Sequence, residues 1–262
     1  MELHLTGKTA VITGASKGIG LAVAQAFAEE GVRVVAGARE LSDDLTQLVG
    51  RYQVHFVAVD LSTPDGPARL VAEAVSTFGG LDILVNNVGA VHPRLEGFLA
   101  ITDGDWNWGL NINFLAAVWT IRAALPHMLD RNAGAIVTIS SVNAFLPDPS
   151  IYDYCAAKAA LSNVSKALSK EVGPRGIRVN TISPGPVATQ LWLGRDGVAA
   201  TIAHASGGAA DAVAKQAAQG MVTGRFTRPD EVADLALLLA SDRAGNVTGA
   251  DFVIDGGLIT TL

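Results

Sequence analysis

Short apolar segments rich in β-branched residues alternate along the chain with longer segments in which apolar residues recur at helical spacing, as in Ile19–Glu30 and Asp230–Ala240. The short segments are almost continuously apolar, which indicates strands buried on both faces, as in a parallel sheet covered by helices. Repeated alternation of strand and helix predicts an open α/β fold with helices on both sides of the sheet. The seven predicted strands are Thr9–Thr13, Val32–Val35, Val54–Val59, Ile83–Val85, Ala135–Ile139, Ile177–Ile182 and Asp251–Ile254.

No Pro/Ser-rich linker and no internal repeat divides the chain, so residues 1–262 are predicted to form a single domain. The segment from Pro186 to Gly220 differs from the rest because it is rich in Gly and Ala and its apolar pattern is interrupted. A segment of this length is often a lid or a mobile insert. We therefore expect residues 186–220 to form a lid near the substrate.

The composition of the chain limits the classes of partner, compartment and metal site that we expect. The chain has 49% hydrophobic and 17% charged residues, a formal charge of -6 and no cluster of Lys and Arg, which argues against nucleic acid or an anionic membrane as a partner. Cys155 is the single cysteine, so no internal disulfide can form. The N-terminus lacks the basic-then-apolar order of a signal peptide, and we expect a cytoplasmic protein. The histidines are scattered and no His-Glu-x-x-His occurs, so no metal site is expected.

A glycine-rich loop, Thr13–Gly20, follows the first predicted strand and opens the first predicted helix. Glycine allows a tight turn and lets the backbone approach a phosphate closely. The free N–H groups and the positive end of a helix can then hold that anion. In this strand–loop–helix context, the loop is predicted to bind a dinucleotide.

The glycine loop, Thr-Gly-x-x-x-Gly-x-Gly, resembles the short-chain dehydrogenase/reductase family, and the resemblance continues in order along essentially the whole chain. Its further motifs are Asn86-Asn87-Val88-Gly89, Asn113, Ser140-Ser141, Tyr154-x-x-x-Lys158, Pro184-Gly185 and Asp255-Gly256-Gly257. The resemblance implies a Rossmann-type, doubly wound parallel sheet of about seven strands. It also implies an oxidoreductase similar to the ketoreductases, including the 3-oxoacyl-carrier-protein reductases.

Two cations favour NADP(H) over NAD(H). An acidic residue near the end of the second strand grips the ribose of NAD, whereas a nearby Arg suits the 2′-phosphate of NADP. By resemblance, Ala38 stands where relatives that prefer NAD have Asp, and Arg39 follows it. Lys17 lies at the start of a helix, where the dipole disfavours a cation by about 0.3–1 kcal/mol unless an anion is bound nearby. The alternative is that Lys17 and Arg39 are solvated surface charges.

The resemblance also assigns the remaining cofactor contacts. Asp60 would meet the adenine ring, with a helix N-cap as its alternative role. Asn86 and Gly89 are expected to face the sugar and phosphate region, and Thr189 would meet the nicotinamide carboxamide. The full set of expected cofactor-binding residues is Gly14, Ser16, Lys17, Gly18, Ile19, Gly20, Arg39, Asp60, Leu61, Asn87, Gly89, Tyr154, Lys158, Pro184, Gly185, Val187 and Thr189.

Tyr154 and Lys158 are four residues apart, which places both side chains on one face of a helix predicted over Tyr152–Glu171. The free pKa of tyrosine is about 10, so acid–base work near neutrality requires roughly 4 kcal/mol of help for the phenolate. A neighbouring ammonium favours the ionised form. We therefore expect Lys158 to lower the pKa of Tyr154, and Tyr154 to serve as the general acid and base. Tyr152 is a poorer candidate because Ala156 occupies its corresponding position.

Ser141 and Asn113 complete the expected catalytic set. Ser141 ends a strand and can donate a hydrogen bond to the substrate oxygen, with Ser140 as the alternative. By resemblance, Asn113 holds a water in the proton path from Lys158, within a helix predicted over about residues 103–128, and Asn111 is its rival.

Mostly apolar residues lie where the substrate is expected, and Asn143 and Trp192 are predicted to contact it together with Ser141 and Tyr154. The favoured function is hydride transfer between NADP(H) and an apolar ketone or secondary alcohol. The alternatives are an NAD-dependent alcohol, sugar or steroid dehydrogenase and a nucleotide-binding regulator without turnover. An enoyl reductase is disfavoured because that branch spaces its Tyr and Lys seven apart. The resemblance also implies a homotetramer.

Overall fold

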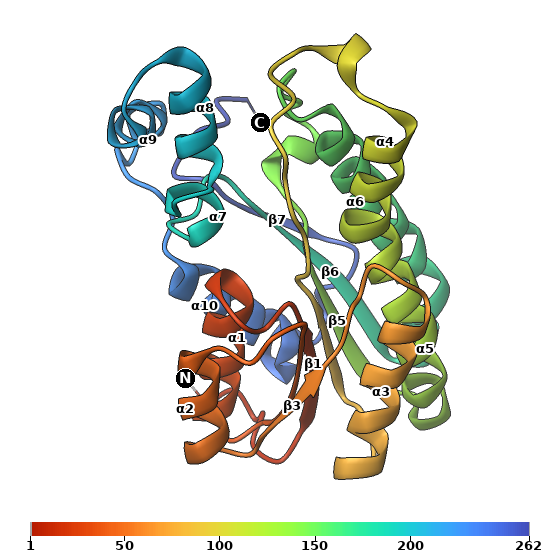
Figure 1. The fold of residues 1–262 in the computed structure, drawn as a ribbon. Helices are drawn as coiled ribbons and strands as arrows, with labels where there is room; N and C mark the ends of the chain where they lie inside the picture. The colour runs from red at the N-terminus through yellow and green to blue at the C-terminus, as the bar shows by residue number, and fades with distance from the viewer. Residues whose placement is uncertain (1, 262) are drawn as a thin grey trace.

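A computed structural model describes residues 2–261, and Met1 and Leu262, the ends of the predicted domain, lie outside the described residues. Seven parallel strands form one sheet in the order β3-β2-β1-β4-β5-β6-β7 (Figure 1). This confirms the predicted fold class. The strands are Thr9–Thr13 (β1), Arg33–Ala38 (β2), Val54–Ala58 (β3), Ile83–Asn86 (β4), Gly134–Ile139 (β5), Ile177–Pro184 (β6) and Asp251–Ile254 (β7).

Helices cover both faces of the sheet (Figure 1). One face carries α1, α2 and α10, and the other carries α3, α5 and α6. The helices are Gly18–Glu29 (α1), Asp43–Arg51 (α2), Asp65–Phe78 (α3), Asp103–Leu110 (α4), Ala116–Arg131 (α5), Tyr152–Val172 (α6), Gln190–Leu193 (α7), Val198–Ser206 (α8), Ala210–Gln219 (α9) and Pro229–Ala240 (α10). Single 3-10 turns span Phe98–Ala100, Val142–Ala144, Gly173–Arg175 and Asp242–Ala244.

Two hydrophobic clusters, one on each side of the sheet, explain the continuous apolar strands. Successive strand residues point to opposite faces, so Ile12 of β1 joins the cluster under α1 and α10, whereas Val11 joins the cluster under α3 and α5. All five residues of β1 are buried. A strand covered on both sides has no exposed position, which is why its sequence is a continuous apolar run rather than an alternating one.

The strand order places a topological switch point at β1, which pairs with β2 on one side and with β4 on the other. The chain therefore leaves these neighbouring strands toward opposite faces, and a crevice opens at their carboxyl ends. The loops that follow β1, β4, β5 and β6 meet at this edge of the sheet.

The insert predicted over residues 186–220 is helical, because α7, α8 and α9 lie within it. Its first residues are fixed to the segment before α10, where Ala188 N donates to Thr227 O at 2.8 Å and Thr227 N donates to Pro186 O at 3.1 Å. Figure 1 shows α7, α8 and α9 as a separate group beside the carboxyl edge of the sheet.

The segment Asp103–Arg131 is long and apolar enough, by length and composition, to cross a membrane. In this fold it is α4, a π turn at Asn111–Leu115 and α5, and α5 packs on the sheet with Ala116, Ile121, Ala124 and Met128 fully or nearly fully buried. Its apolar residues are therefore those of a helix that covers a sheet.

Candidate active site

The glycine loop is held in place by close backbone approaches. Gly14 and Gly18 have φ values of +67° and +58°, in the region that favours glycine. A Cβ on Gly20 would lie 2.3 Å from Gly14 O, so only glycine lets α1 begin this close to the loop. The Asn87 side-chain amide donates to Thr13 O and Gly14 O at 2.9 and 3.2 Å, which ties the loop to β4.

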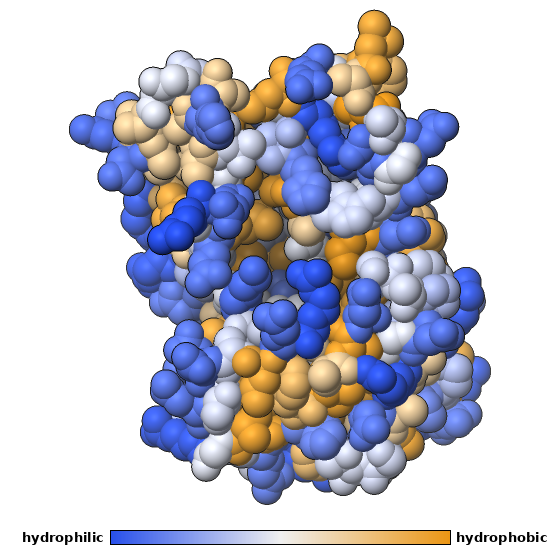
Figure 2. Space-filling model, in the orientation of Figure 1, coloured by the Kyte–Doolittle hydropathy of each residue, from blue (hydrophilic) through white to orange (hydrophobic). Residues whose placement is uncertain are grey.

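A cavity of about 740 Å³ lies at the carboxyl edge of the sheet and joins this loop to the predicted reacting residues. Figure 2 shows the surface hollowed there, with apolar side chains on the floor of the hollow. Of the residues predicted for the site, Gly20, Asn86 and Asn113 do not line the cavity. Those that do are Gly14, Ser16, Lys17, Gly18, Ile19, Arg39, Asp60, Leu61, Asn87, Gly89, Ser141, Asn143, Tyr154, Lys158, Pro184, Gly185, Val187, Thr189 and Trp192.

Lys17 and Arg39 lie at the cofactor end of the cavity, beside Ala38. Both cations are exposed, and neither has an ion-pair partner within residues 2–261. Lys17 is the N-cap of α1 and makes no side-chain capping bond. The site therefore presents two basic groups beside a helix N-terminus, an arrangement suited to a phosphate.

Asp60 does not cap a helix, so the alternative role considered for it is wrong. The helix that follows begins at Asp65 with Pro64 as its N-cap. Asp60 instead accepts hydrogen bonds from Ser62 N at 2.9 Å and Ser62 Oγ at 2.8 Å. These bonds, with a smaller contribution from the charge of Arg39, lower the pKa of the Asp60 carboxyl. Its carboxylate is thereby fixed at the rim of the cavity.

The predicted helix that carries Tyr154 and Lys158 is confirmed as α6. Lys158 is 3% exposed, and its Nζ lies 5.6 Å from the centre of the Tyr154 ring and donates to Ile139 O at 2.8 Å. Burial raises the pKa of Tyr154 to about 12, which the neighbouring Ser141 hydroxyl only partly offsets. Burial also lowers the pKa of Lys158 to about 8.

The expectation of a lowered tyrosine pKa is therefore wrong for the protein without cofactor. Removal from water disfavours both charged forms, the phenolate and the ammonium. The lysine ammonium donates to the Ile139 carbonyl group and lies over the tyrosine ring. The result is a tyrosine that holds its proton firmly and a lysine that titrates near neutrality.

Ser140 and Ser141 both line the cavity, but their hydroxyl groups have different partners. Ser141 Oγ accepts from Asn143 N at 3.1 Å and donates to Asn143 Oδ1 at 3.2 Å. Ser140 Oγ lies 2.6 Å from Ser162 Oγ, within the packing against α6. The geometry thus favours Ser141 as the hydroxyl that meets a substrate oxygen, held by Asn143.

Asn113 lies in a π turn that interrupts the predicted helix, an irregularity frequent at functional sites. Its side-chain amide donates to Ala90 O and Gly109 O, and its Oδ1 accepts from Ala90 N at 2.9 Å. A Cβ on Gly89 would lie 2.9 Å from Asn113 Oδ1 and 3.5 Å from Lys158 Nζ. Asn113 therefore fixes the loop after β4 close to Lys158.

Asn86 does not face the cofactor region as expected. Strand alternation puts it on the same face as Leu84, under the helix layer, where it is 3% exposed. Its side-chain N and O have no hydrogen-bond partner within the described residues. The next residue, Asn87, lines the cavity instead.

Sequence reasoning missed several residues that line the substrate end of the cavity. They come from separate elements, and no local motif marks them; they include Trp108, Ile112, Ile202, Gln216 and Leu258. Trp108 stacks on His92 with the two ring centres 4.1 Å apart and the planes inclined by 3°. Among residues 2–261, no group of three or more His, Cys, Asp or Glu side chains could hold a metal ion.

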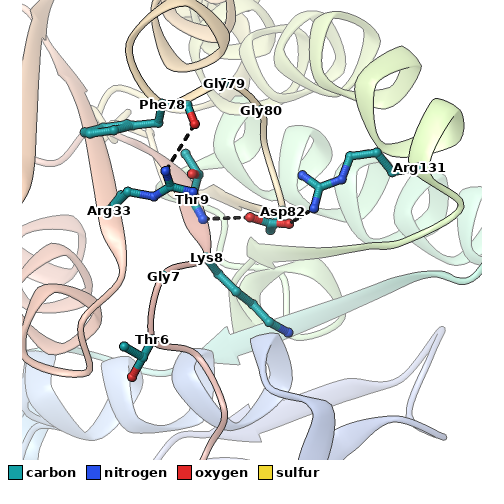
Figure 3. A pocket seen from close by; sticks show the side chains of 10 residues that line it. All are labelled: Thr6, Gly7, Lys8, Thr9, Arg33, Phe78, Gly79, Gly80, Asp82 and Arg131. Carbon is teal, nitrogen blue, oxygen red and sulfur yellow. Dashed lines mark hydrogen bonds and ion pairs between the residues drawn. The ribbon is translucent and has the colours of Figure 1, made fainter.

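A second cavity, of about 510 Å³, lies at the amino edge of the sheet (Figure 3). Its basic residues bind protein groups: Arg131 pairs with Asp82 at 2.7 Å, and Arg33 donates to Phe78 O at 3.2 Å. Lys8 pairs with Asp242 at 2.9 Å. Asp82 also accepts from Thr9 N at 2.8 Å. These contacts join the starts of β1, β2 and β4.

Comparison with known proteins defines the class. Residues 14–259 match the family model described as Enoyl-(Acyl carrier protein) reductase. Together with relatives that share more than a third of its residues over nearly its full length, this match shows that the chain belongs to the short-chain dehydrogenase/reductase family.

The relatives act on different small molecules. The chain is 35% identical to a 2,5-dichloro-2,5-cyclohexadiene-1,4-diol dehydrogenase of Sphingobium indicum, with 98% of each chain covered. It is 38% identical to the D-threitol dehydrogenase of Mycolicibacterium smegmatis, with 98% of this chain and 94% of that protein covered. The L-sorbose reductase of Gluconobacter frateurii, solved with NADPH and L-sorbose, superposes with a TM-score of 0.91 at 37% identity, with 100% of both chains covered.

Proposed function

We propose that this protein is an NADP(H)-dependent oxidoreductase that interconverts a ketone and a secondary alcohol. The observation that carries the proposal is that one cavity joins the glycine loop and the cations Lys17 and Arg39, which have no ion-pair partner within residues 2–261, to Ser141, Tyr154 and Lys158. A dinucleotide whose phosphates bind at the glycine loop would bring its nicotinamide ring toward Ser141, Tyr154 and Lys158.

The residues present fit NADP(H). Backbone at Gly14 and Gly18 can approach a pyrophosphate, and Lys17 and Arg39 offer two cations beside Ala38 for a 2′-phosphate. The other cavity-lining positions predicted for the cofactor would hold its adenine, ribose and nicotinamide groups, and Thr189 packs against the loop at Gly18. The likeness to a reductase solved with NADPH supports this choice over NAD(H).

The cofactor, when bound, supplies the hydride for the carbonyl carbon. Tyr154, whose pKa of about 12 keeps it protonated at neutral pH, donates its phenolic proton to the carbonyl oxygen. The Ser141 hydroxyl, oriented by Asn143, donates a hydrogen bond to the same oxygen. The Lys158 ammonium stabilises the phenolate that forms as the proton leaves. A firmly held proton suits reduction better than oxidation near neutral pH.

The substrate end of the cavity supports an apolar ketone. Trp108, Ile112 and Ile202 are among the side chains that line this end. Within residues 2–261, the only Lys and Arg residues that line any part of the cavity are Lys17, Arg39 and Lys158. The spacing of four between Tyr154 and Lys158 supports a carbonyl rather than an enoyl substrate.

The test is the loss of NADPH absorbance with a panel of ketones, comparing the native protein with Tyr154→Phe. Removal of a general acid costs about 10²–10⁴-fold in rate, so we expect kcat to fall by that factor while the Kd for NADPH stays unchanged. Tyr152→Phe is the matched control, because Tyr152 lies on the same helix, packs edge-on against Phe98 and does not line the cavity. Equal rates in the native and Tyr154→Phe proteins would remove Tyr154 as the acid.

We also propose a cytoplasmic homotetramer in which α5 and α6 pack between subunits. Val164 on α6 is an exposed apolar residue that supports such a contact. Sedimentation of the purified protein as a monomer would contradict the tetramer.

A further inference from the structure

Two tryptophans, each packed on a second aromatic ring, line the substrate end of the cavity from different elements. Trp108 belongs to α4 and Trp192 to α7, and both residues line the cavity. Figure 1 shows α7 on the left and α4 on the right, beyond the carboxyl edge of the sheet. Trp108 is stacked flat on His92, and the Trp192 ring lies 5.4 Å from that of Phe226. We propose that these two indoles form an aromatic clamp selecting ketones in which the carbonyl is attached to a flat, unsaturated ring. The inference deepens the proposed function and rests on it.

The backbone next to Trp108 packs against the residue that precedes Tyr154. The next residue, Gly109, packs so tightly against α6 that a Cβ on it would lie 2.6 Å from Asp153 Oδ2. Asp153 immediately precedes Tyr154, so the tryptophan and the acid are each the direct chain neighbour of a residue in this contact. Because Trp108 and Tyr154 also line one cavity, we expect the indole to meet the substituent next to the carbonyl carbon.

The position of α4 against α6 is fixed by buried charge. Arg94 pairs with Asp153 at 2.8 Å and with Asp105 of α4 at 2.7 Å, and Asp153 is 1% exposed. The parallel stack of His92 covers one face of the Trp108 indole, which leaves its other face and its edge for the cavity. The Trp108 side of the clamp is therefore preorganised, and a preorganised wall loses little entropy when a ligand packs on it.

A flat aromatic ring is attracted to indole walls more strongly than a puckered ring of the same size. Aromatic pairs in stacked or edge-to-face contact are stabilised beyond what burial of their area provides. A saturated ring is buried to a similar extent but lacks this additional attraction. The observations therefore distinguish an aryl ketone from an apolar ketone in general.

The test compares acetophenone with cyclohexyl methyl ketone, which share a carbon skeleton and differ in the saturation of the ring. With Trp108→Leu, we expect kcat/KM for acetophenone to fall about tenfold, mainly through KM, and that for cyclohexyl methyl ketone to fall less than threefold. Trp108→Phe should retain most of the native preference, which also guards against a folding defect in the leucine variant.

Trp106→Leu is the matched control. Trp106 lies on the same helix, packs edge-on against Phe98 and does not line the cavity, so both ketones should keep their native kcat/KM. Equal losses for the two ketones in Trp108→Leu would overturn the clamp and leave simple apolar burial. If the native protein reduced neither of these ketones nor any other in a broad panel, the proposed function itself would fail, and the two failures are therefore distinguishable.

Discussion

The cavities at the two ends of the strands both contain basic side chains, but they use them in opposite ways. At the amino edge, Arg131, Lys8 and Arg33 are bound to protein carboxylates or a carbonyl group, and they join the starts of neighbouring strands (Figure 3). At the carboxyl edge, Lys17 and Arg39 are exposed and without ion-pair partners among residues 2–261, and Lys158 is buried beside a tyrosine. Charges that bind one another support the fold, whereas charges left without a partner are available to a ligand.

The two regions also differ in how far their basic side chains are buried. The Lys158 ammonium is desolvated, and within residues 2–261 its one hydrogen bond is to Ile139 O. Arg131, in contrast, is half exposed and forms an ion pair. The unfavourable environment of Lys158 lowers its proton affinity into a range that acid–base chemistry can use.

The largest expected difference between the two regions is in pH dependence. Lys158 loses its proton as the pH rises through about 8, whereas Tyr154 keeps its proton until about 12. Because the ammonium stabilises the forming phenolate, kcat/KM for ketone reduction should fall about tenfold per pH unit above pH 8. Stopped-flow or steady-state rates between pH 6 and 10 measure this limb.

The Lys158→Arg variant provides the control for that limb, because a guanidinium stays charged throughout this range. Its residual rate should lose the decline above pH 8. A native profile that is flat to pH 10 would show that Lys158 carries no part of the reaction.

A smaller difference is expected in cofactor affinity. If Lys17 and Arg39 hold a 2′-phosphate, Lys17→Ala and Arg39→Ala should each raise the Kd for NADPH about tenfold and leave the Kd for NADH within twofold, since a charge-assisted hydrogen bond is worth ~1.5 kcal/mol or more. Fluorescence titration measures both constants. Lys8→Ala, at the amino edge, is the matched control and should change neither. A Kd for NADH well below that for NADPH in the native protein would reverse the choice of cofactor.

The smallest expected effect on catalysis comes from the amino edge. Asp82→Asn weakens the ion pair with Arg131 and the bond from Thr9 N, so the free energy of unfolding should fall by about 1 kcal/mol and Tm by roughly 2–4 °C. Reduction kcat/KM at 25 °C should remain within twofold of native. Thermal denaturation and steady-state kinetics on one preparation separate the two effects, and a large loss of activity without a loss of Tm would place function at this edge.

The sequence predicted most of the fold because its signals are local. Continuous apolar runs identified the strands, and the spacing of Tyr154 and Lys158 identified one face of α6 correctly. The sequence predicted less well which residue at the end of a strand reaches the cavity. Asn86 and Asn87 are adjacent, and which of them reaches the cavity depends on the face that each occupies in the sheet.

Other features depend on contacts between distant segments and had no local signal. The pKa of Tyr154 is raised because surrounding segments of the chain desolvate its phenol, and a helix spacing of four cannot reveal that. Trp108 reaches the cavity because α4 packs on α6 at Gly109 and a π turn follows. The helices within residues 186–220 were not predicted, because this segment is rich in Gly and Ala and its apolar pattern is interrupted.

The strand order also has a consequence for how the chain folds during synthesis. β1 must wait for β4, some seventy residues later, and β6 acquires its outer neighbour only when residues 251–254 emerge. At ~5–20 residues per second, translation takes tens of seconds, and for its last part the nascent sheet presents an unpaired strand edge. Such an edge is a template for aggregation. When β7 pairs with β6, a border strand of 8 residues is replaced by one of 4 residues, and a short edge strand is a poorer template for another chain.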